Sequence, residues 1–139
     1  MAINFVLSEE AAQEQLERIL DFYEIDRADL PEDQKVAYDS STKGILKGFR
    51  LGRLDIIEND KGFQIKQILR SPPGDINEIV YGEIGARAKR SMDGIKVDNQ
   101  YRRMYTFLGS ASGLGCKAIE SLKGADLSLA ESLAIFFQM

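Results

Sequence analysis

Residues 54–69 read LDIIENDKGFQIKQIL, and no other part of this 139-residue chain alternates apolar and polar side chains as a strand does. Two strand-like runs, 54–57 and 63–69, flank Asn-Asp-Lys-Gly at 59–62, which is typical of a tight turn. The pattern predicts a β-hairpin with one face in water and the other on helices, because two strands alone are only marginally stable. We therefore expect an α+β fold: a mostly helical single domain with about five to six helices and one central β-hairpin.

Two helices are expected before the hairpin. Residues 8–24 begin with Ser8 as N-cap and carry apolar side chains at helical spacing. A second helix begins at Pro31 and runs toward Phe49, with a weak helical stretch at 39–42 that can divide it. The N-terminal helices thus occupy residues 1–50.

Glycines recur every fourth residue at the end of this second helix, at Gly44, Gly48 and Gly52. On a helix this spacing leaves a smooth strip that another backbone can approach closely. The more common role of glycine is punctuation, so we favour a helix end followed by entry into the first strand.

The hairpin, within residues 51–70, is followed by Ser71-Pro72-Pro73-Gly74, which ends the second strand because proline donates no ladder hydrogen bond. A third helix is expected from Asp75 to Gly94, since Asp75 and Glu78 have the spacing of a capping box. It opens a C-terminal helical part at residues 74–139.

Three further helices are expected in this C-terminal part. The fourth spans about 99–111, a short one contains Ile119 and Leu122, and the last begins at the capping signal Ser128-x-x-Glu131. Most apolar residues of the last helix fall within one sector: Leu129, Ala130, Leu133, Ala134, Phe136 and Phe137.

Ile135 is the exception in the last helix, because it falls among the polar residues of the opposite face. A docked core helix with one stray apolar residue is the simpler interpretation. The sharper hypothesis is that Ile135 and the rim of Phe136 contact a protein partner.

Composition excludes several classes of site. The chain has a net charge of −4, a single cysteine and no histidine, so it supports neither a disulfide framework nor a Cys/His metal centre. It lacks a targeting segment and any run near the roughly 18 apolar residues that a membrane helix needs. We expect a cytoplasmic protein without cofactor, metal or membrane partner.

Charge is polarised along the chain. Residues 1–33 hold ten acids against two arginines, whereas the segment from 87 to 103 is basic. Its basic side chains are Arg87, Lys89, Arg90, Lys96, Arg102 and Arg103. A solvated or partner-facing patch is the favoured interpretation, and we assign Arg87, Lys89, Arg90, Arg102 and Arg103 to partner binding; nucleic acid is the less favoured ligand.

The sequence gives little support for nucleotide binding or for catalysis. The glycine-rich stretch 109–117 lacks the Gly-Lys-Ser/Thr of a phosphate loop and follows a helix, so it predicts a helix-helix corner. Glu83 and Arg87 are four residues apart and are expected to form a structural ion pair rather than a catalytic one. No residue is assigned to catalysis.

The order of these parts resembles the tail assembly chaperones of long-tailed bacteriophages and prophages. The resemblance covers roughly residues 44–139. It is carried by Gly52-Arg-Leu-Asp-Ile, by Leu69-Arg-Ser-Pro72-Pro73-Gly-Asp75, and by Phe107-Leu108, Gly113-Leu114, Leu122-x-x-x-Asp126 and Phe136. The acidic N-terminal helix has no counterpart in this pattern.

The resemblance implies a non-enzymatic protein that keeps the tape measure protein soluble and brings tail tube subunits to it in the host cytoplasm. It also implies several copies per assembly, hence a possible homo-oligomer, and often a longer product made by translational frameshift. Two other functions stay open: a structural adaptor retained in its complex, and a small nucleic-acid-binding regulator that uses residues 87–103.

Overall fold

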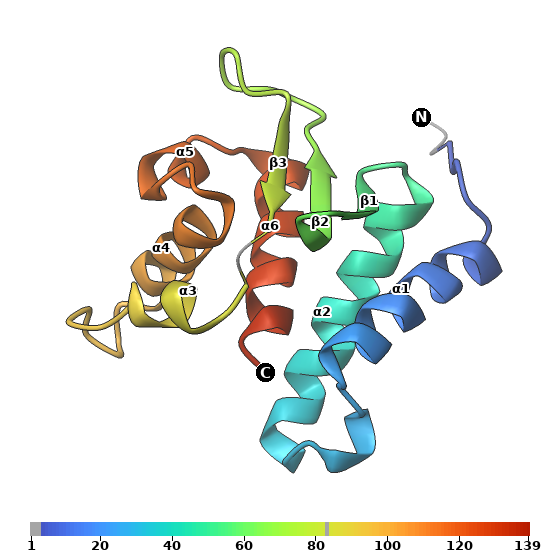
Figure 1. Cartoon of the computed structure of the whole chain (residues 1–139), viewed down its shortest axis with the longest axis horizontal. Helices are drawn as coiled ribbons and strands as arrows, with labels where there is room; N and C mark the ends of the chain where they lie inside the picture. The colour runs from blue at the N-terminus through green and yellow to red at the C-terminus, as the bar shows by residue number, and fades with distance from the viewer. Residues whose placement is uncertain (1–3, 83) are drawn as a thin grey trace.

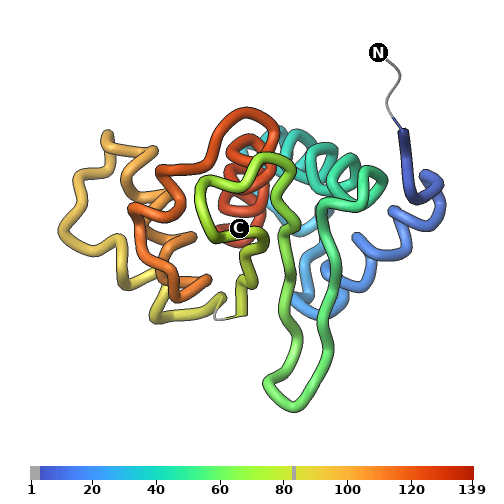
Figure 2. The backbone as a smooth tube through the Cα atoms, turned by 90° about the horizontal axis from the view of Figure 1, so that it is seen from above, coloured from blue at the N-terminus to red at the C-terminus, as the bar shows by residue number. Residues whose placement is uncertain are grey.

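The hairpin is present in the computed structural model, which describes residues 4–82 and 84–139. Strand β1 (Leu54–Asn59) pairs antiparallel with β2 (Gly62–Ile68), and only two residues form the turn between them. Gly62 closes the turn with φ of 101°, a conformation that glycine adopts without steric cost. One face of the hairpin packs on the core and its tip projects from the body of the molecule, as Figure 2 shows.

A third strand, β3 (Glu78–Tyr81), pairs antiparallel with β2 and gives the sheet the order β1-β2-β3. The expected helix from Asp75 was therefore wrong. Ile79 and Tyr81 are buried while Glu78 points outward and pairs with Lys66 at 3.7 Å, so the segment follows strand periodicity. The open edge of β2 offers backbone partners that outweigh the local capping signal, and helix is confined to α3 (Ala86–Arg90).

The remaining helices lie on both sides of the last one. They are α1 (Glu9–Tyr23), the 3-10 turn η1 (Arg27–Asp29), α2 (Glu32–Arg50), α4 (Gln100–Ser112) and α5 (Cys116–Glu120), and the last helix is α6 (Gly124–Phe137). Figure 1 shows α6 in the middle, with α1 and α2 on one side and α3, α4 and α5 on the other. Ser8 caps α1 as expected, its Oγ accepting from the N–H of Ala11 at 3.1 Å.

Helix α2 runs unbroken through the weak stretch at 39–42. The hydroxyls of Ser41 and Thr42 donate to the carbonyl of Tyr38 at 3.1 and 2.8 Å, so these residues satisfy their polar groups inside the helix. Both residues are buried, which places this part of α2 inside the core rather than at a break.

The glycines of α2 permit close contact with α6. A Cβ atom at Gly44 would lie 2.5 Å from Oγ of Ser132, and one at Gly48 would lie 2.9 Å from Cδ1 of Leu129. The smooth-strip interpretation thus holds for these two glycines, and the favoured punctuation interpretation was wrong for them. The punctuation interpretation holds for Gly52, which follows α2 and has a φ of 73°.

Helix α6 begins four residues before the expected capping signal at Ser128. Asp126 in its first turn is buried, and its two carboxylate oxygens accept from the backbone N–H groups of Arg70 and Ser71 at 2.8 and 2.9 Å. Ser128 is exposed within the helix. The capping signal at Ser128 does not determine where α6 begins, because contact with the residues that follow β2 sets the start of the helix.

A buried polar network extends this contact into the sheet. Gln67 is fully buried; its Nε2 donates to the carbonyl of Asp126 at 2.9 Å and its Oε1 accepts from the hydroxyl of Tyr81 at 2.8 Å. Among the described residues, no buried side-chain nitrogen or oxygen lacks a hydrogen-bond partner. The network therefore joins β2, β3 and α6 without an unsatisfied polar group.

We expect Asp126→Ala to lower the free energy of unfolding by about 1–3 kcal/mol, because two backbone N–H groups lose their charged acceptor. Chemical denaturation monitored by circular dichroism measures the change. Asp93 is exposed and supplies the control, and Asp93→Ala should stay within about 0.5 kcal/mol of the parent protein. Equal stability of the two variants would contradict the role of Asp126 in holding α6 to β2.

Gly109 gives a second stability prediction. A Cβ atom there would lie 2.4 Å from the carbonyl carbon of Gly115 and 2.6 Å from the nitrogen of Cys116, where α4 meets α5. Gly109→Ala should therefore destabilise by about 1–3 kcal/mol through overpacking, although alanine is the better helix former by about 1 kcal/mol.

The matched control is Gly85→Ala, because a Cβ at Gly85 would meet nothing within 4 Å and its φ is −162°. Thermal unfolding of both variants should show the larger loss at Gly109. A stabilised Gly109→Ala protein would mean that α5 can move aside.

Candidate partner-binding surfaces

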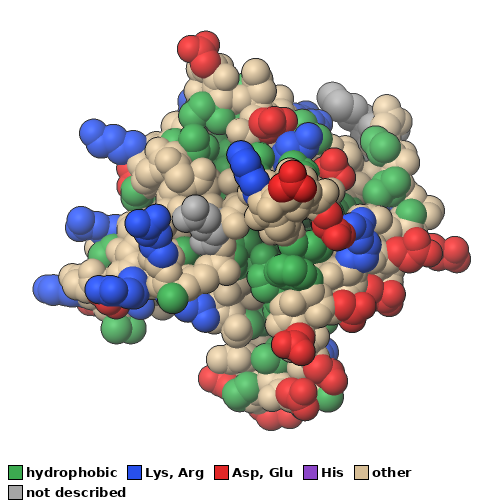
Figure 3. Space-filling view, viewed as in Figure 1, with side chains coloured by type: hydrophobic (Ala, Val, Ile, Leu, Met, Phe, Trp, Pro, Cys, Tyr) green, Lys and Arg blue, Asp and Glu red, His purple; other side chains and the backbone are tan. Residues whose placement is uncertain are grey.

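The predicted basic residues come together on one side of the molecule. Helices α3 and α4 pack on each other, and Lys and Arg side chains gather on the left of Figure 3 over these two helices. We call this surface the basic end and define it by Arg87, Lys89, Arg90, Lys96 and Arg102, together with the exposed apolar residues Val97 and Tyr101. Arg87, Lys89 and Arg90 are exposed on α3, and Arg102 is exposed on α4.

Arg103 has a different role from its neighbours. Its Nη1 donates to the carbonyls of Met92 and Ile95 at 3.3 and 2.8 Å, and the residue is half-buried. It ties the turn after α3 to α4, so its guanidinium is already hydrogen-bonded within the protein. The assignment of Arg103 to partner binding is replaced by this structural role. Glu83, the expected partner of Arg87, lies outside the described residues.

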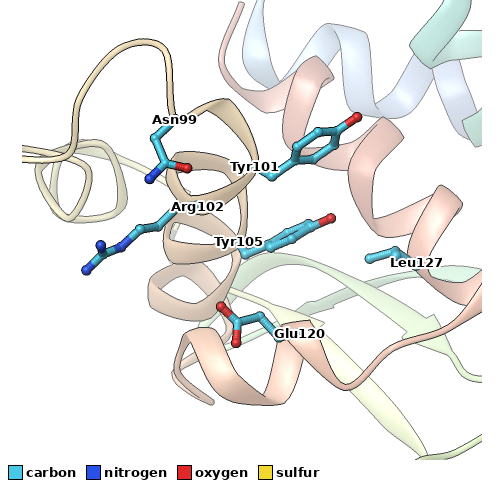
Figure 4. A pocket seen from close by; sticks show the side chains of 6 residues that line it. All are labelled: Asn99, Tyr101, Arg102, Tyr105, Glu120 and Leu127. Carbon is cyan, nitrogen blue, oxygen red and sulfur yellow. The ribbon is translucent and has the colours of Figure 1, made fainter.

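A cleft of about 350 Å³ adjoins the basic end (Figure 4). Its lining residues are Asn99, Tyr101, Arg102, Tyr105, Glu120 and Leu127. The rings of Tyr101 and Tyr105 lie side by side with centroids 6.1 Å apart, and Arg102 points away from them. A cleft lined by two aromatic rings suits a side chain of a protein partner.

The hydroxyl of Tyr105 donates to Oε2 of Glu131 on α6 at 2.9 Å. Desolvation and this carboxylate raise the pKa of Tyr105 to about 12, so the phenol stays neutral and remains a hydrogen-bond donor at physiological pH. Tyr105 therefore contributes an aromatic ring and a neutral hydroxyl to the cleft.

Ile135 is on the surface of α6, with 37% of its area exposed. It follows Glu131 by one helical turn and so lies on the α6 face that meets Tyr105. Phe136 is fully buried and packs against Tyr38, with ring centroids 6.5 Å apart. The expected surface at the end of α6 therefore consists of Ile135 without Phe136.

A further surface was not found from the sequence. Phe22 of α1 is 54% exposed and stacks on Phe63 of β2, with centroids 4.2 Å apart and ring planes at 9°. Tyr23 meets both rings edge-on. We call Phe22, Tyr23 and Phe63 the aromatic patch. Burial raises the pKa of Tyr23 to about 12, so this ring too stays neutral.

Acidic side chains border the aromatic patch. Asp21 precedes Phe22 on α1, Glu24 follows Tyr23 as the C-cap of α1, and Glu58 lies directly opposite Phe63 in the hairpin. Arg18 of α1 forms an ion pair with Glu58. Figure 3 shows apolar side chains near the centre of the face, with acids beside them. One signal was present in the sequence: Phe22 is a large apolar residue off the apolar stripe of its helix.

The glycine-rich turn between α4 and α5 is a helix-helix corner, as predicted. It borders an open groove of about 840 Å³ together with the outer side of β2 and β3. The thiol of Cys116 contacts Thr106 and Glu120 at 3.7 and 3.3 Å, and burial raises its pKa. A protonated thiol is a poor nucleophile, so the groove offers no activated group at this position.

Two further properties concern the part of the chain that the structure describes. Residues 4–82 and 84–139 contain no cluster of three or more His, Cys, Asp or Glu side chains arranged to hold a metal ion. In the same residues no helix is both long and apolar enough to cross a membrane.

Comparison of the chain with models of known protein families, with curated protein sequences and with solved structures gives no match in any of the three. The surfaces must therefore be interpreted from their own chemistry.

Adjacent arginines on α4 provide a test of the basic end. Arg103→Ala should lower the free energy of unfolding by about 1–3 kcal/mol, because two carbonyls lose a charged donor. Arg102→Ala removes the same charge from an exposed position and should change stability by less than about 0.5 kcal/mol. Urea denaturation compares them, and a larger loss at Arg102 would reverse the roles of the two arginines.

Proposed function

We propose that this protein is a non-enzymatic assembly chaperone of the phage tail type, which binds the tape measure protein and brings tail tube subunits to it. The observation that carries the proposal is the exposed ring of Phe22, stacked on the half-buried Phe63 of the projecting hairpin. The resemblance of residues 44–139 to this family supplies the names of the partners.

Exposed aromatic pairs suit the binding of an apolar client. Aromatic side chains bring large contact area at low entropic cost, and the strongest contacts at protein interfaces are enriched in them. Phe22 and Phe63 are already stacked on each other, so little ordering is needed when a client arrives. Covering an exposed phenylalanine stabilises a complex by about 1.5–3 kcal/mol.

The acidic border indicates the chemistry of that client. Asp21 precedes Phe22 in the chain, Glu24 follows Tyr23, and Glu58 lies opposite Phe63 in the hairpin; opposite charges across an interface favour correct pairing and fast association. A helical segment with apolar side chains flanked by Lys or Arg fits this surface. A long helical tape measure chain, kept soluble by such contacts, is the client that we propose.

The basic end favours a second candidate, a small nucleic-acid-binding regulator. Tyr101 is exposed and precedes Arg102 on α4, and aromatic and basic residues on one element can stack on bases and contact phosphates. Nucleic-acid affinity falls steeply between low and physiological salt, whereas binding through an apolar surface does not. Binding to client protein that persists in high salt favours the chaperone.

The proposal predicts a long coiled-coil protein encoded immediately downstream, and co-expression with that protein tests it. The parent chain should keep that protein in the soluble fraction and co-purify with it. Phe22→Ser should weaken the complex about tenfold or more, because the exposed ring no longer contributes its buried area. An isolated gene with no such neighbour would count against the phage assignment.

Leu114→Ser is the matched control, since Leu114 is also an exposed apolar residue but lies in the turn between α4 and α5. It should leave co-purification unchanged. Equal effects of the two substitutions would contradict a specific role for the aromatic patch. A client that is equally soluble without the protein would contradict chaperone activity, and presence of the chain in finished particles would favour the retained adaptor.

A further inference from the structure

Strand β3 is at one edge of the sheet, and its outer side is open at Val80. Just beyond the paired residues of β2 and β3, Leu69 donates to the carbonyl of Asn77 at 3.0 Å. Bonded pairs alternate in an antiparallel ladder, so Ile79 and Tyr81 carry the bonds from β3 to β2. The N–H and C=O of Val80 therefore point away from β2, and no described residue bonds to them. They remain available to a further strand.

Other positions on the sheet edges are already closed. At the end of β3, the N–H of Gly82 donates to the carbonyl of Ala111 on α4 at 3.2 Å. In the middle of β1, at the opposite edge, the N–H of Ile56 donates to Oδ1 of Asp55 at 3.0 Å. Proteins commonly cover or interrupt sheet edges, which prevents pairing with other chains. Val80 instead lines an open groove.

This groove has a volume of about 840 Å³. Ligand sites in proteins commonly enclose about 300–1,000 Å³, so the groove is of ligand-binding size. Part of its lining is the corner between α4 and α5, where the side chains are small or missing: Ser110, Ala111, Ser112, Gly113 and Gly115. A Cβ atom at Gly113 or Gly115 would meet nothing within 4 Å, so this corner leaves room for a neighbouring chain.

The polar groups of the groove favour an anionic partner. Lys61 and Arg87 line it, and none of its described lining residues is acidic. Gln64 and Ser110 are half-buried there, and their side chains form no hydrogen bond with another described residue. The amide of Gln64 lies beside β3, because a Cβ atom at Gly82 would be 2.5 Å from its Nε2. Positive charge thus occurs together with amide and hydroxyl groups that can bond to a peptide backbone.

We propose that a protein partner binds in this groove as an extended acidic segment, which pairs with β3 as a fourth strand of the sheet. Main-chain hydrogen bonds to Val80 contribute affinity, and the groove selects among side chains. Lys61 and Arg87 favour Asp or Glu in the segment over Lys or Arg. The bond from Gly82 to Ala111 closes the edge beyond Val80 and so limits the added strand at that end.

This site differs from the aromatic patch in the shape and charge of its partner. The client proposed for the patch is a helix flanked by Lys or Arg, whereas the groove takes an extended acidic segment. The lining of the groove includes neither Phe22 nor Phe63. Its test uses a synthetic peptide and the purified protein, so it succeeds or fails independently of the proposed chaperone function.

Amide hydrogen exchange at Val80, followed by NMR, tests the pairing directly. The probe is a seven-residue peptide of alternating threonine and valine with aspartate at both ends and blocked termini, and the control peptide has lysine at both ends. In the protein alone, the N–H of Val80 should exchange faster than that of Ile79, which is bonded to β2. Saturating acidic probe should slow exchange at Val80 about tenfold or more and leave Ile79 nearly unchanged.

Two pairs of variants separate backbone pairing from charge, with affinities measured by fluorescence anisotropy. Val80→Pro removes the outward N–H, which an edge strand tolerates, and should weaken binding of the acidic probe about tenfold. Val80→Thr keeps that N–H and should bind as the parent does. At low salt, Lys61→Glu should weaken binding about threefold or more, because like charges then meet. Lys47→Glu changes an exposed lysine of α2 outside the groove and should have no effect.

Circular dichroism checks that each variant folds. If Val80→Pro does not fold, the exchange measurement on the parent protein decides the outcome by itself. Slower exchange at Val80 with the acidic probe would support the proposal, as would weaker binding in Val80→Pro but not in Val80→Thr.

Several results would overturn the proposal. The acidic probe could fail to bind or leave exchange at Val80 unchanged, or a folded Val80→Pro protein could bind it as well as the parent does. Equal affinity for the acidic and lysine-ended peptides would contradict the stated chemistry of the partner. A single-stranded RNA or DNA oligonucleotide that displaces the probe and loses affinity in Lys61→Glu would assign the groove to nucleic acid instead.

Discussion

Burial of polar groups at the start of α6 constrains the whole fold. Asp126 accepts from two backbone N–H groups at the end of β2, and Gln67 links the same helical turn to Tyr81 of β3. Each of these groups would be costly to leave unpaired away from water. A slip of one residue in the sheet would turn Gln67 to the opposite face, so the network fixes register as well as position.

The position of α6 in turn places the functional surfaces. Its apolar sector is covered by α2 on one side and α4 on the other, and the glycines of α2 allow the first of these contacts to be close. The acid-rich helix α1 therefore falls on one side of the sheet and the basic helices α3 and α4 on the other. The aromatic patch forms because the hairpin, held by the same network, reaches Phe22 of α1.

Local patterns predicted most of this arrangement, and distant contacts decided the rest. The hairpin, α1, α2 and α4 follow from periodicity and caps that lie within each segment. Strand β3 is too short to show its period, and the cap-like spacing of Asp75 and Glu78 pointed to helix instead. The start of α6 depends on partners 55 and 56 residues away. Phe22 stands out locally because it lies off the apolar stripe of α1, but no local pattern indicates that it stacks on Phe63.

The separation of charge has a consequence for how the protein meets any charged surface. Its sequence pI of about 4.9 means a net negative charge near neutral pH, and net charge alone predicts no affinity for polyanions. A molecule with a cluster of basic side chains on one side behaves instead as an electric dipole and turns that side toward a negative surface. It is expected to be retarded on cation-exchange as well as anion-exchange resins, so net charge alone is a poor guide to its handling.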